Sequence, residues 1–169
     1  WLNNKKGTTG YVMVSATNER DVKLVQEING KPIFLKYQQE AYFQSNLHRY
    51  LYFNGYNTVG LTDFSFEIDD AGMPFWVVTK YKKQVGFSGN DATGIVVVNA
   101  QNGEIKEYDI KNTPTWVDRI QPISFIKDQL NDWGEYVKGY WNFSNENKLL
   151  NASGLLYRAP TNPYWEYSA

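Results

Sequence analysis

LTDFSFEIDDAGMPFWVVTKYKKQVGFSGNDATGIVVVNAQNGEIKEYD, residues 61–109, carries the clearest fold signal in this chain. Every second side chain in residues 64–68 is apolar, which is typical of a strand with one dry face. Residues 69–72, DDAG, favour a turn, and a returning strand is expected over residues 75–81. Successive segments of this kind predict antiparallel pairing.

The second half of the same stretch predicts a further hairpin. A looser Gly-rich connection over residues 86–94 leads to IVVV at residues 95–98, a continuous apolar run. Residues 99–103, NAQNG, predict a tight turn with Gly103 at positive φ, followed by an exit strand over residues 104–110. We therefore predict an antiparallel β-meander.

The N-terminal part of the chain has similar signals on a smaller scale. Residues 1–10 are polar and Gly-punctuated, so we interpret them as a linker or tail. Short strands are expected over residues 11–15, 21–28 and 31–37. The Asn-Gly pair at residues 29–30 joins the last two, because both residues tolerate positive φ.

Two segments have helical periodicity instead. In residues 40–54 the apolar side chains recur at helical spacing, and Gly55 follows as a C-terminal cap. The apolar positions are Tyr42, Phe43, Leu47, Tyr50 and Leu51. A second helix is expected over residues 114–140, with starts at Pro114 and Pro122 and a weak point at Gly134.

These elements predict an α+β fold, a mainly antiparallel sheet with one or two helices packed on it. The length of 169 residues suits a single domain, which we place at residues 11–141, or two tightly packed subdomains. Residues 142–169 are rich in Asn, Ser and Pro, so we expect an irregular C-terminal extension packed on that domain.

Composition limits the function classes. Seventeen basic and 18 acidic residues give a net charge of −1, so no overall field favours nucleic acid. The chain has no cysteine, which excludes disulfides, thiolate metal sites and a cysteine nucleophile. It begins at Trp1 and contains no apolar run near the roughly 18 residues that span a bilayer. We expect it to belong to a longer protein, with any membrane contact made through a segment absent from this sequence.

The helix, the strands and GIVVVNAQNGEI at residues 94–105 together resemble the PepSY-type module of bacterial secreted and membrane-associated proteins. The resemblance covers residues 40–110. In that family the closing hairpin has a Val-rich strand, an Asp-x-x-Thr-Gly turn and an exit strand. Here Asn99 replaces the aspartate and Asn102 replaces the threonine, and both still suit a turn. The resemblance implies an extracytoplasmic, non-catalytic, regulatory or inhibitory module of the cell envelope.

Catalytic chemistry has few candidates. His48 is the only histidine, and GFSGN at residues 86–90 misses the Gly-x-Ser-x-Gly elbow by one position. We therefore expect His48 to be a structural or surface residue, and no metal or cofactor. Four carboxylates surround the first meander turn and leave open a small carboxylate-dependent hydrolase acting on envelope polysaccharide or peptide. They are Asp63, Glu67, Asp69 and Asp70, and a hairpin turn by itself also favours them.

Aromatic residues, 17% of the chain, are the remaining signal. Trp116, Trp133 and Tyr140 recur at helical spacing and are interpreted as core. Other aromatics lie outside the periodic segments, where both a core and a binding role stay open. The candidate ligand-binding residues are Phe87, Asn90, Trp141, Tyr164 and Trp165. The leading hypothesis is a non-enzymatic extracytoplasmic binding or regulatory domain that recognises a protein partner or an envelope polymer.

Overall fold

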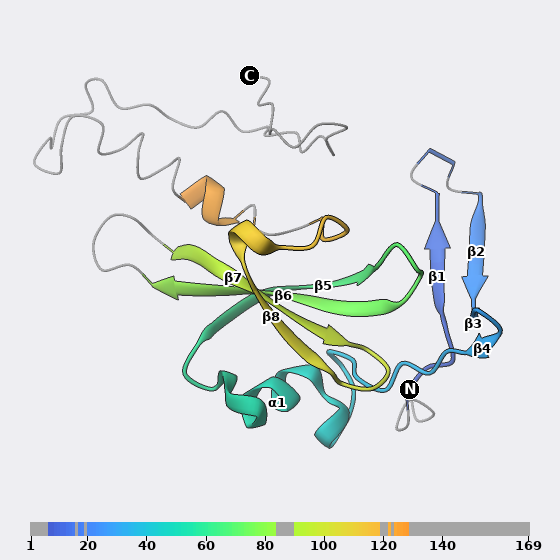
Figure 1. Cartoon of the computed structure of the whole chain (residues 1–169), viewed down its shortest axis with the longest axis horizontal. Helices are drawn as coiled ribbons and strands as arrows, with labels where there is room; N and C mark the ends of the chain where they lie inside the picture. Colours follow the sequence, from blue (N-terminus) through green and yellow to red (C-terminus); the bar gives the residue numbers. More distant parts are fainter. Residues whose placement is uncertain are drawn as a thin grey trace, which may run out of the picture. The chain divides into compact units, whose positions relative to one another are not determined.

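The computed structural model describes residues 7–15, 17–18, 20–83, 90–118, 122 and 124–128 (Figure 1). The chain divides into two units, residues 1–83 with 90–122, and residues 84–89 with 123–169. Of the second unit, residues 124–128 are described, and they are helical. The first unit ends before the predicted boundary at residue 141, and the predicted extension over residues 142–169 lies outside the described residues.

A four-stranded antiparallel meander forms the centre of the first unit. Its strands are β5 (Gly60–Ile68), β6 (Pro74–Lys83), β7 (Asn90–Asn99) and β8 (Ile105–Asp109), and they lie side by side in that order. The predicted α+β fold and its antiparallel sheet are therefore confirmed. The predicted loop over residues 86–94 is wrong in its second half, because residues 90–94 belong to β7. A register shift at Lys80/Tyr81 lets both strands continue, so that Lys83 pairs with Asn90.

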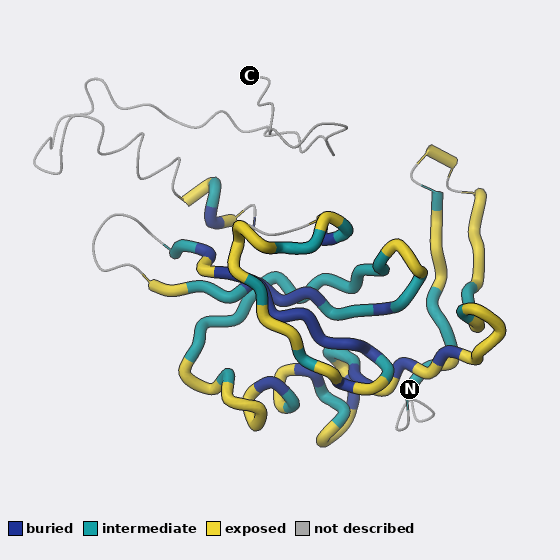
Figure 2. Tube along the Cα trace, viewed as in Figure 1, coloured by how far each residue is buried: buried dark blue, intermediate teal, exposed yellow. Residues whose placement is uncertain are grey.

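β7 is buried on both faces, which explains its continuous apolar run (Figure 2). Val96 and Val98 face one side and pack with Leu47 and Leu51 of the helical segment. The alternate residues of the run pack on the other side with Val77 and Val117. Because successive side chains of a strand point to opposite faces, β7 contributes residues to two separate core clusters.

Both predicted meander turns are present. At the first, the Asp69 Oδ1 atom accepts hydrogen bonds from the Ala71 and Met73 amides, at 2.9 and 2.8 Å. At the second, the Asn99 Oδ1 atom accepts from the Gln101 amide at 2.9 Å, and Gly103 has a φ of 81°. The second turn also encloses Gly103 sterically, since an added Cβ would lie 2.6 Å from the Tyr37 ring.

The helical segment packs on the sheet as expected, but its start differs from the prediction. A 3₁₀ turn (η2, Phe43–Ser45) precedes the α-helix α1 (Leu47–Leu51), and a π-helical turn (η3, Tyr52–Tyr56) follows. The α-helix begins at residue 47 because the Asn46 side chain caps it, accepting from the Arg49 amide at 3.0 Å. Gly55, at a φ of 98°, has the left-handed conformation that its capping role predicts.

The N-terminal region contains two small antiparallel pairs. β1 (Tyr11–Val14) pairs with β2 (Val22–Val25), and β3 (Glu27–Ile28) pairs with β4 (Lys31–Pro32) across the predicted Asn-Gly turn. The predicted strand over residues 31–37 is too long. Beyond β4 the chain makes isolated bridges, from Leu35 to Thr8 and from Gln38 to Asn46, and it buries Ile33 and Leu35 against Ala100.

A short 3₁₀ turn, η4 (Ile110–Asn112), follows β8. The predicted helical start at Pro114 is instead a single turn, in which the Val117 amide donates to the Pro114 carbonyl at 3.1 Å. Trp116 packs on Phe75 with ring centroids 5.1 Å apart, in agreement with its predicted core role. Trp133, Gly134 and Tyr140 lie outside the described residues. Within the described ranges, no helix has the length and apolar character to cross a membrane.

Candidate functional site

The candidate ligand-binding residues from sequence are not brought together by the described structure. Phe87, Trp141, Tyr164 and Trp165 lie outside the described residues. Asn90 is half-buried at the start of β7 and pairs with Lys83. Asn90 is therefore part of the sheet and not of a loop.

Two of the four carboxylates around the first meander turn, Glu67 and Asp69, accept hydrogen bonds that hold the described structure. Asp69 is used by the turn itself, as described above. Glu67 accepts from the Ser65 hydroxyl and, through Oε2, from the Asp118 amide at 2.9 Å. Asp63 has a φ of 49° at the β5 bulge. In the part of the chain that is described, no group of three or more acidic or histidine side chains could hold a metal ion.

His48 is exposed on α1, and its ring packs on Phe64 with centroids 4.0 Å apart. This contact agrees with the predicted structural or surface role.

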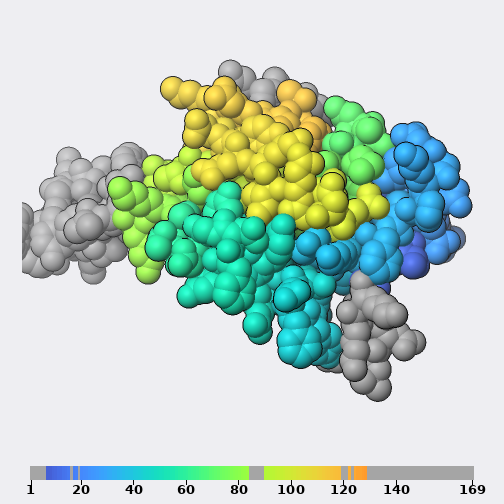
Figure 3. Space-filling model, turned by 60° about the horizontal axis from the view of Figure 1, so that its bottom comes forward, coloured from blue at the N-terminus to red at the C-terminus, as the bar shows by residue number. Residues whose placement is uncertain are grey.

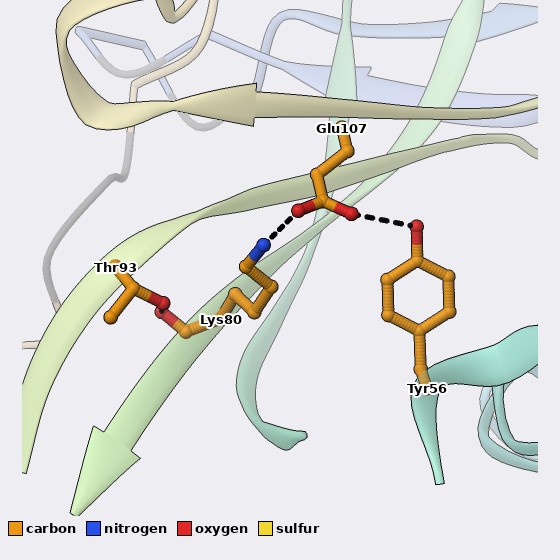
Figure 4. Close-up of polar contacts among 4 residues, drawn as sticks. All are labelled: Tyr56, Lys80, Thr93 and Glu107. Atoms are coloured by element: carbon orange, nitrogen blue, oxygen red, sulfur yellow. Dashed lines mark hydrogen bonds and ion pairs between the residues drawn. The ribbon is translucent and has the colours of Figure 1, made fainter. Parts of the chain in front are cut away.

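A second polar cluster joins the helical segment to the sheet (Figure 4). Glu107 forms an ion pair with Lys80 and accepts from the Tyr56 hydroxyl at 3.2 Å. Because Glu107 bridges η3 and β6, we interpret this cluster as a structural tie.

A groove beside α1 is the strongest candidate site. It has a volume of about 530 Å³ and lies where the chain entering the helical segment meets η2, α1 and η3. Figure 3 shows this side of the molecule, with the helical segment in teal beside the yellow surface of β8 and the turn before it. The lining residues are Lys36, Tyr37, Phe43, Gln44, Arg49, Tyr50 and Phe53.

Two tyrosines form a fixed part of the groove wall. The Tyr37 and Tyr50 ring centroids lie 4.4 Å apart, and the Lys36 ammonium lies 5.1 Å from the Tyr37 centroid. The Tyr50 hydroxyl donates to the Gly103 carbonyl at 2.8 Å. Burial, with a smaller contribution from Tyr37, raises the pKa of Tyr50 above its ordinary value of 10.0. Tyr50 is therefore a neutral hydrogen-bond donor at physiological pH.

Two phenylalanines line the groove with rings that are largely in solvent. Phe43 is 75% exposed and Phe53 is 74% exposed. Phe43 also has a φ of 50°, a left-handed conformation that is rare for a bulky residue. Such strain is retained where the surroundings enforce it, and it is frequent at binding sites. The exposed rings give the groove an apolar surface available to a ligand.

The charge of the groove is one-sided. Its described lining includes two cations, Lys36 and Arg49, and no carboxylate. An arginine guanidinium matches a carboxylate with two parallel hydrogen bonds, while a lysine acts as a point charge. The groove therefore has the chemistry to hold an apolar group next to an acidic one.

Sequence periodicity missed this site because it assigned Tyr42 and Phe43 to the buried face of a helix. Both are exposed, since they precede the Asn46 cap. The cap was the available signal: an Asn followed by an apolar, helix-forming run marks a helix start after Phe43.

Comparisons of the chain with protein-family models, with curated proteins and with solved structures find no match. The resemblance of residues 40–110 to the PepSY-type module stays a prediction.

Proposed function

We propose that this chain is a non-enzymatic binding domain of a larger bacterial envelope protein, and that the groove beside α1 binds an acidic, apolar segment of a protein partner. The observation that carries the proposal is the pair of exposed rings, Phe43 and Phe53, in a groove lined by two cations. The extracytoplasmic location and the regulatory role rest on the PepSY resemblance, which also implies a non-catalytic module.

The aromatic residues supply the affinity in this proposal. Full burial of one phenylalanine side chain contributes about 1.5–3 kcal/mol relative to exposure. Tyr37 and Tyr50 are already held by their ring contact and by the bond to Gly103, so their ordering on binding loses little entropy. A short segment with one or two apolar side chains fits such a site.

The cations supply selectivity. Exposed charges of one sign steer an oppositely charged partner and reject a like-charged one, and salt screens both effects. Lys36 and Arg49 therefore favour a segment with Asp or Glu beside its apolar side chains. The net charge of the chain is only −1, so the preference for an acidic segment comes from the two cations of the groove.

Two synthetic peptide pools test the proposal. Both carry Leu and Phe at random positions, and the remaining positions are Asp and Glu in one pool and Lys and Arg in the other. We expect fluorescence anisotropy to detect binding of the acidic pool, weakened by salt. Phe53→Ser should reduce affinity at least about tenfold, the range of an aromatic hot spot. Ile110→Ser, at an exposed apolar position on η4, is the matched control and should bind like the parent chain.

Specific outcomes contradict the proposal. If neither pool binds, or if Phe53→Ser and Ile110→Ser bind alike, the groove is not the site. Sedimentation with purified peptidoglycan that is lost in Phe53→Ser, without peptide binding, would make the groove a site for an envelope polymer. Release of soluble fragments from peptidoglycan, lost in Asp69→Asn or Asp70→Asn, would favour the hydrolase.

A further inference from the structure

The chain contains three Asn-Gly pairs, at residues 29–30, 54–55 and 102–103, and all of them lie in the described structure. Such a pair loses the asparagine amide without an enzyme. The glycine nitrogen attacks the asparagine Cγ, because no glycine Cβ hinders the approach, and the NH₂ group leaves as ammonia with the glycine N–H proton. Water then opens the cyclic imide to aspartate or isoaspartate, so one water is consumed for each ammonia released.

The folded structure controls the rate of this reaction. Ring closure needs a free asparagine side chain, a glycine amide that can lose its proton, and backbone rotation that brings the two together. Rotation within a turn requires local opening, whose free energy differs widely from place to place in one protein. The three pairs therefore react at different rates wherever their surroundings differ.

The Asn102–Gly103 pair is held at both reacting groups. The Asn102 Oδ1 atom accepts from the Glu104 amide at 2.8 Å, and the Gly103 amide donates to the Asn99 carbonyl at 2.9 Å. Gly103 is also buried, with the Tyr37 ring 2.6 Å from the position of an added Cβ. This pair is therefore protected.

The Asn54–Gly55 pair is held at the side chain. The Asn54 amide nitrogen, the leaving group of the reaction, donates to the Tyr50 carbonyl at 2.7 Å. The pair lies in η3, which continues α1, and α1 packs on the sheet through the fully buried Leu51. Attack on Asn54 requires loss of this hydrogen bond, so this pair, next to the groove residue Phe53, is also protected.

The third pair, Asn29–Gly30, has neither restraint. Both residues are exposed at the turn between β3 and β4. Within the described residues, neither the Asn29 side chain nor the Gly30 amide makes a hydrogen bond. An added Cβ at Gly30 would have no atom within 4 Å, so water reaches the amide that must lose its proton.

The hairpin around this pair is small. β3 and β4 pair over two residues each, and Pro32 has no amide hydrogen to donate. Of these paired residues, only Ile28 packs on a core cluster. A two-stranded hairpin is marginally stable by itself, so opening at residues 29–30 costs less than opening of the β7–β8 turn, which belongs to a four-stranded sheet.

We infer that Asn29 is a self-modification site, which converts to aspartate and isoaspartate in the folded protein ahead of Asn54 and Asn102. Each conversion adds one negative charge to a chain whose net charge is −1. Isoaspartate also adds one methylene group to the backbone of a two-residue turn. The pairing of Ile28 with Lys31 across that turn is then lost, because hairpin register depends on loop length.

Peptide mapping of the full chain during incubation at mildly alkaline pH tests the inference. Digestion with pepsin at acidic pH stops the reaction, and mass spectrometry measures the acid form of each asparagine. We expect Asn29 to convert at least about tenfold faster than Asn54 and Asn102 in the folded chain, since local opening sets the rate. In guanidinium chloride the three pairs should convert at similar rates, because each asparagine is followed by glycine.

Two variants identify the reacting groups. Gly30→Ala places a Cβ on the attacking residue and should slow conversion at Asn29 severalfold, although it also weakens the turn. Gly55→Ala, at another exposed glycine with positive φ and open surroundings, is the matched control and should leave Asn29 unchanged. Asn29→Gln should remove most of the ammonia that the folded chain releases, and thermal melting checks that each variant is folded.

Three results would overturn the inference. Asn54 or Asn102 could convert as fast as Asn29 in the folded chain. Asn29 could stay intact in the folded chain while it converts in guanidinium chloride, which would show that the closed turn protects it. Gly30→Ala could leave the rate at Asn29 unchanged, which would exclude attack by the Gly30 nitrogen.

Discussion

β7 and the β1–β2 hairpin are both rich in aliphatic residues, but these residues are buried in β7 and largely exposed in the hairpin. Residues 95–98 of β7, IVVV, are buried on both faces, whereas residues 12–14 of β1, VMV, are exposed. β7 has strands on both sides and covering residues on both faces, while β1 has one partner strand among the residues that the structure describes. An apolar β-strand pattern thus indicates a strand, and its burial depends on what the rest of the chain places over it.

The largest expected effect separates the two regions directly. Ile95→Ala removes a fully buried side chain from β7 and should lower the free energy of unfolding by about 2–5 kcal/mol. Leu24→Ala removes an exposed one and should change it by less than about 0.5 kcal/mol. Urea unfolding of dilute protein measures both. Equal losses would mean that Leu24 is covered in the folded chain.

A second pair of variants compares a turn of the sheet with a turn of the N-terminal region. Gly103→Ala forces a Cβ into the Tyr37 ring at a positive φ and should destabilise by about 1–3 kcal/mol. Gly30→Ala has a similar φ of 72° but open space around the new Cβ, so only the conformational penalty of about 1 kcal/mol remains. Thermal melts that show the same loss for both would contradict enclosure of Gly103 by Tyr37.

Phe43→Asn concerns the strained residue of the groove. Asn tolerates left-handed φ better than Phe, so the free energy of unfolding should stay level or rise by up to about 1 kcal/mol. The same change removes an exposed ring, and peptide binding should fall. Denaturant midpoints and anisotropy titrations on one preparation check both effects. Destabilisation by more than about 1 kcal/mol would show that the Phe43 ring is part of the core.

The smallest effect is expected at alkaline pH. Burial raises the pKa of Tyr50 in the groove, and burial followed by the Asp69 charge raises that of Tyr11 in the hairpin, both above 10.0. The folded protein then keeps these protons to higher pH than the unfolded chain. The contribution of the two tyrosines to the free energy of unfolding is therefore fully present below pH 10.0 and is lost as pH rises through the folded-state pKa values. Tyr50→Phe and Tyr11→Phe should each flatten the fall measured by chemical unfolding against pH. An unchanged slope in both would contradict the shifts.

The sequence predicted the meander well because its signals are local. Period-two alternation set the strands, and Asp69, Asn99 and Gly103 set the turns through side-chain oxygens and positive φ. The extension of β7 back to Asn90 was missed because cross-strand pairing with Lys83 is not a local property. The groove was missed for a related reason. Phe43 matches the helical spacing of Leu47, and only the Asn46 cap separates an exposed residue from a buried one.

The hydrogen bond from Tyr50 to Gly103 joins the groove to the β7–β8 turn. A ligand that binds the groove only while Tyr50 keeps this hydrogen bond also stabilises the closed turn, and thermodynamic coupling between two events acts equally in both directions. Opening of the turn then weakens binding by the same factor by which binding suppresses opening. The Gly103 amide donates to the Asn99 carbonyl at 2.9 Å, and we expect it to exchange its hydrogen more slowly when the groove is filled.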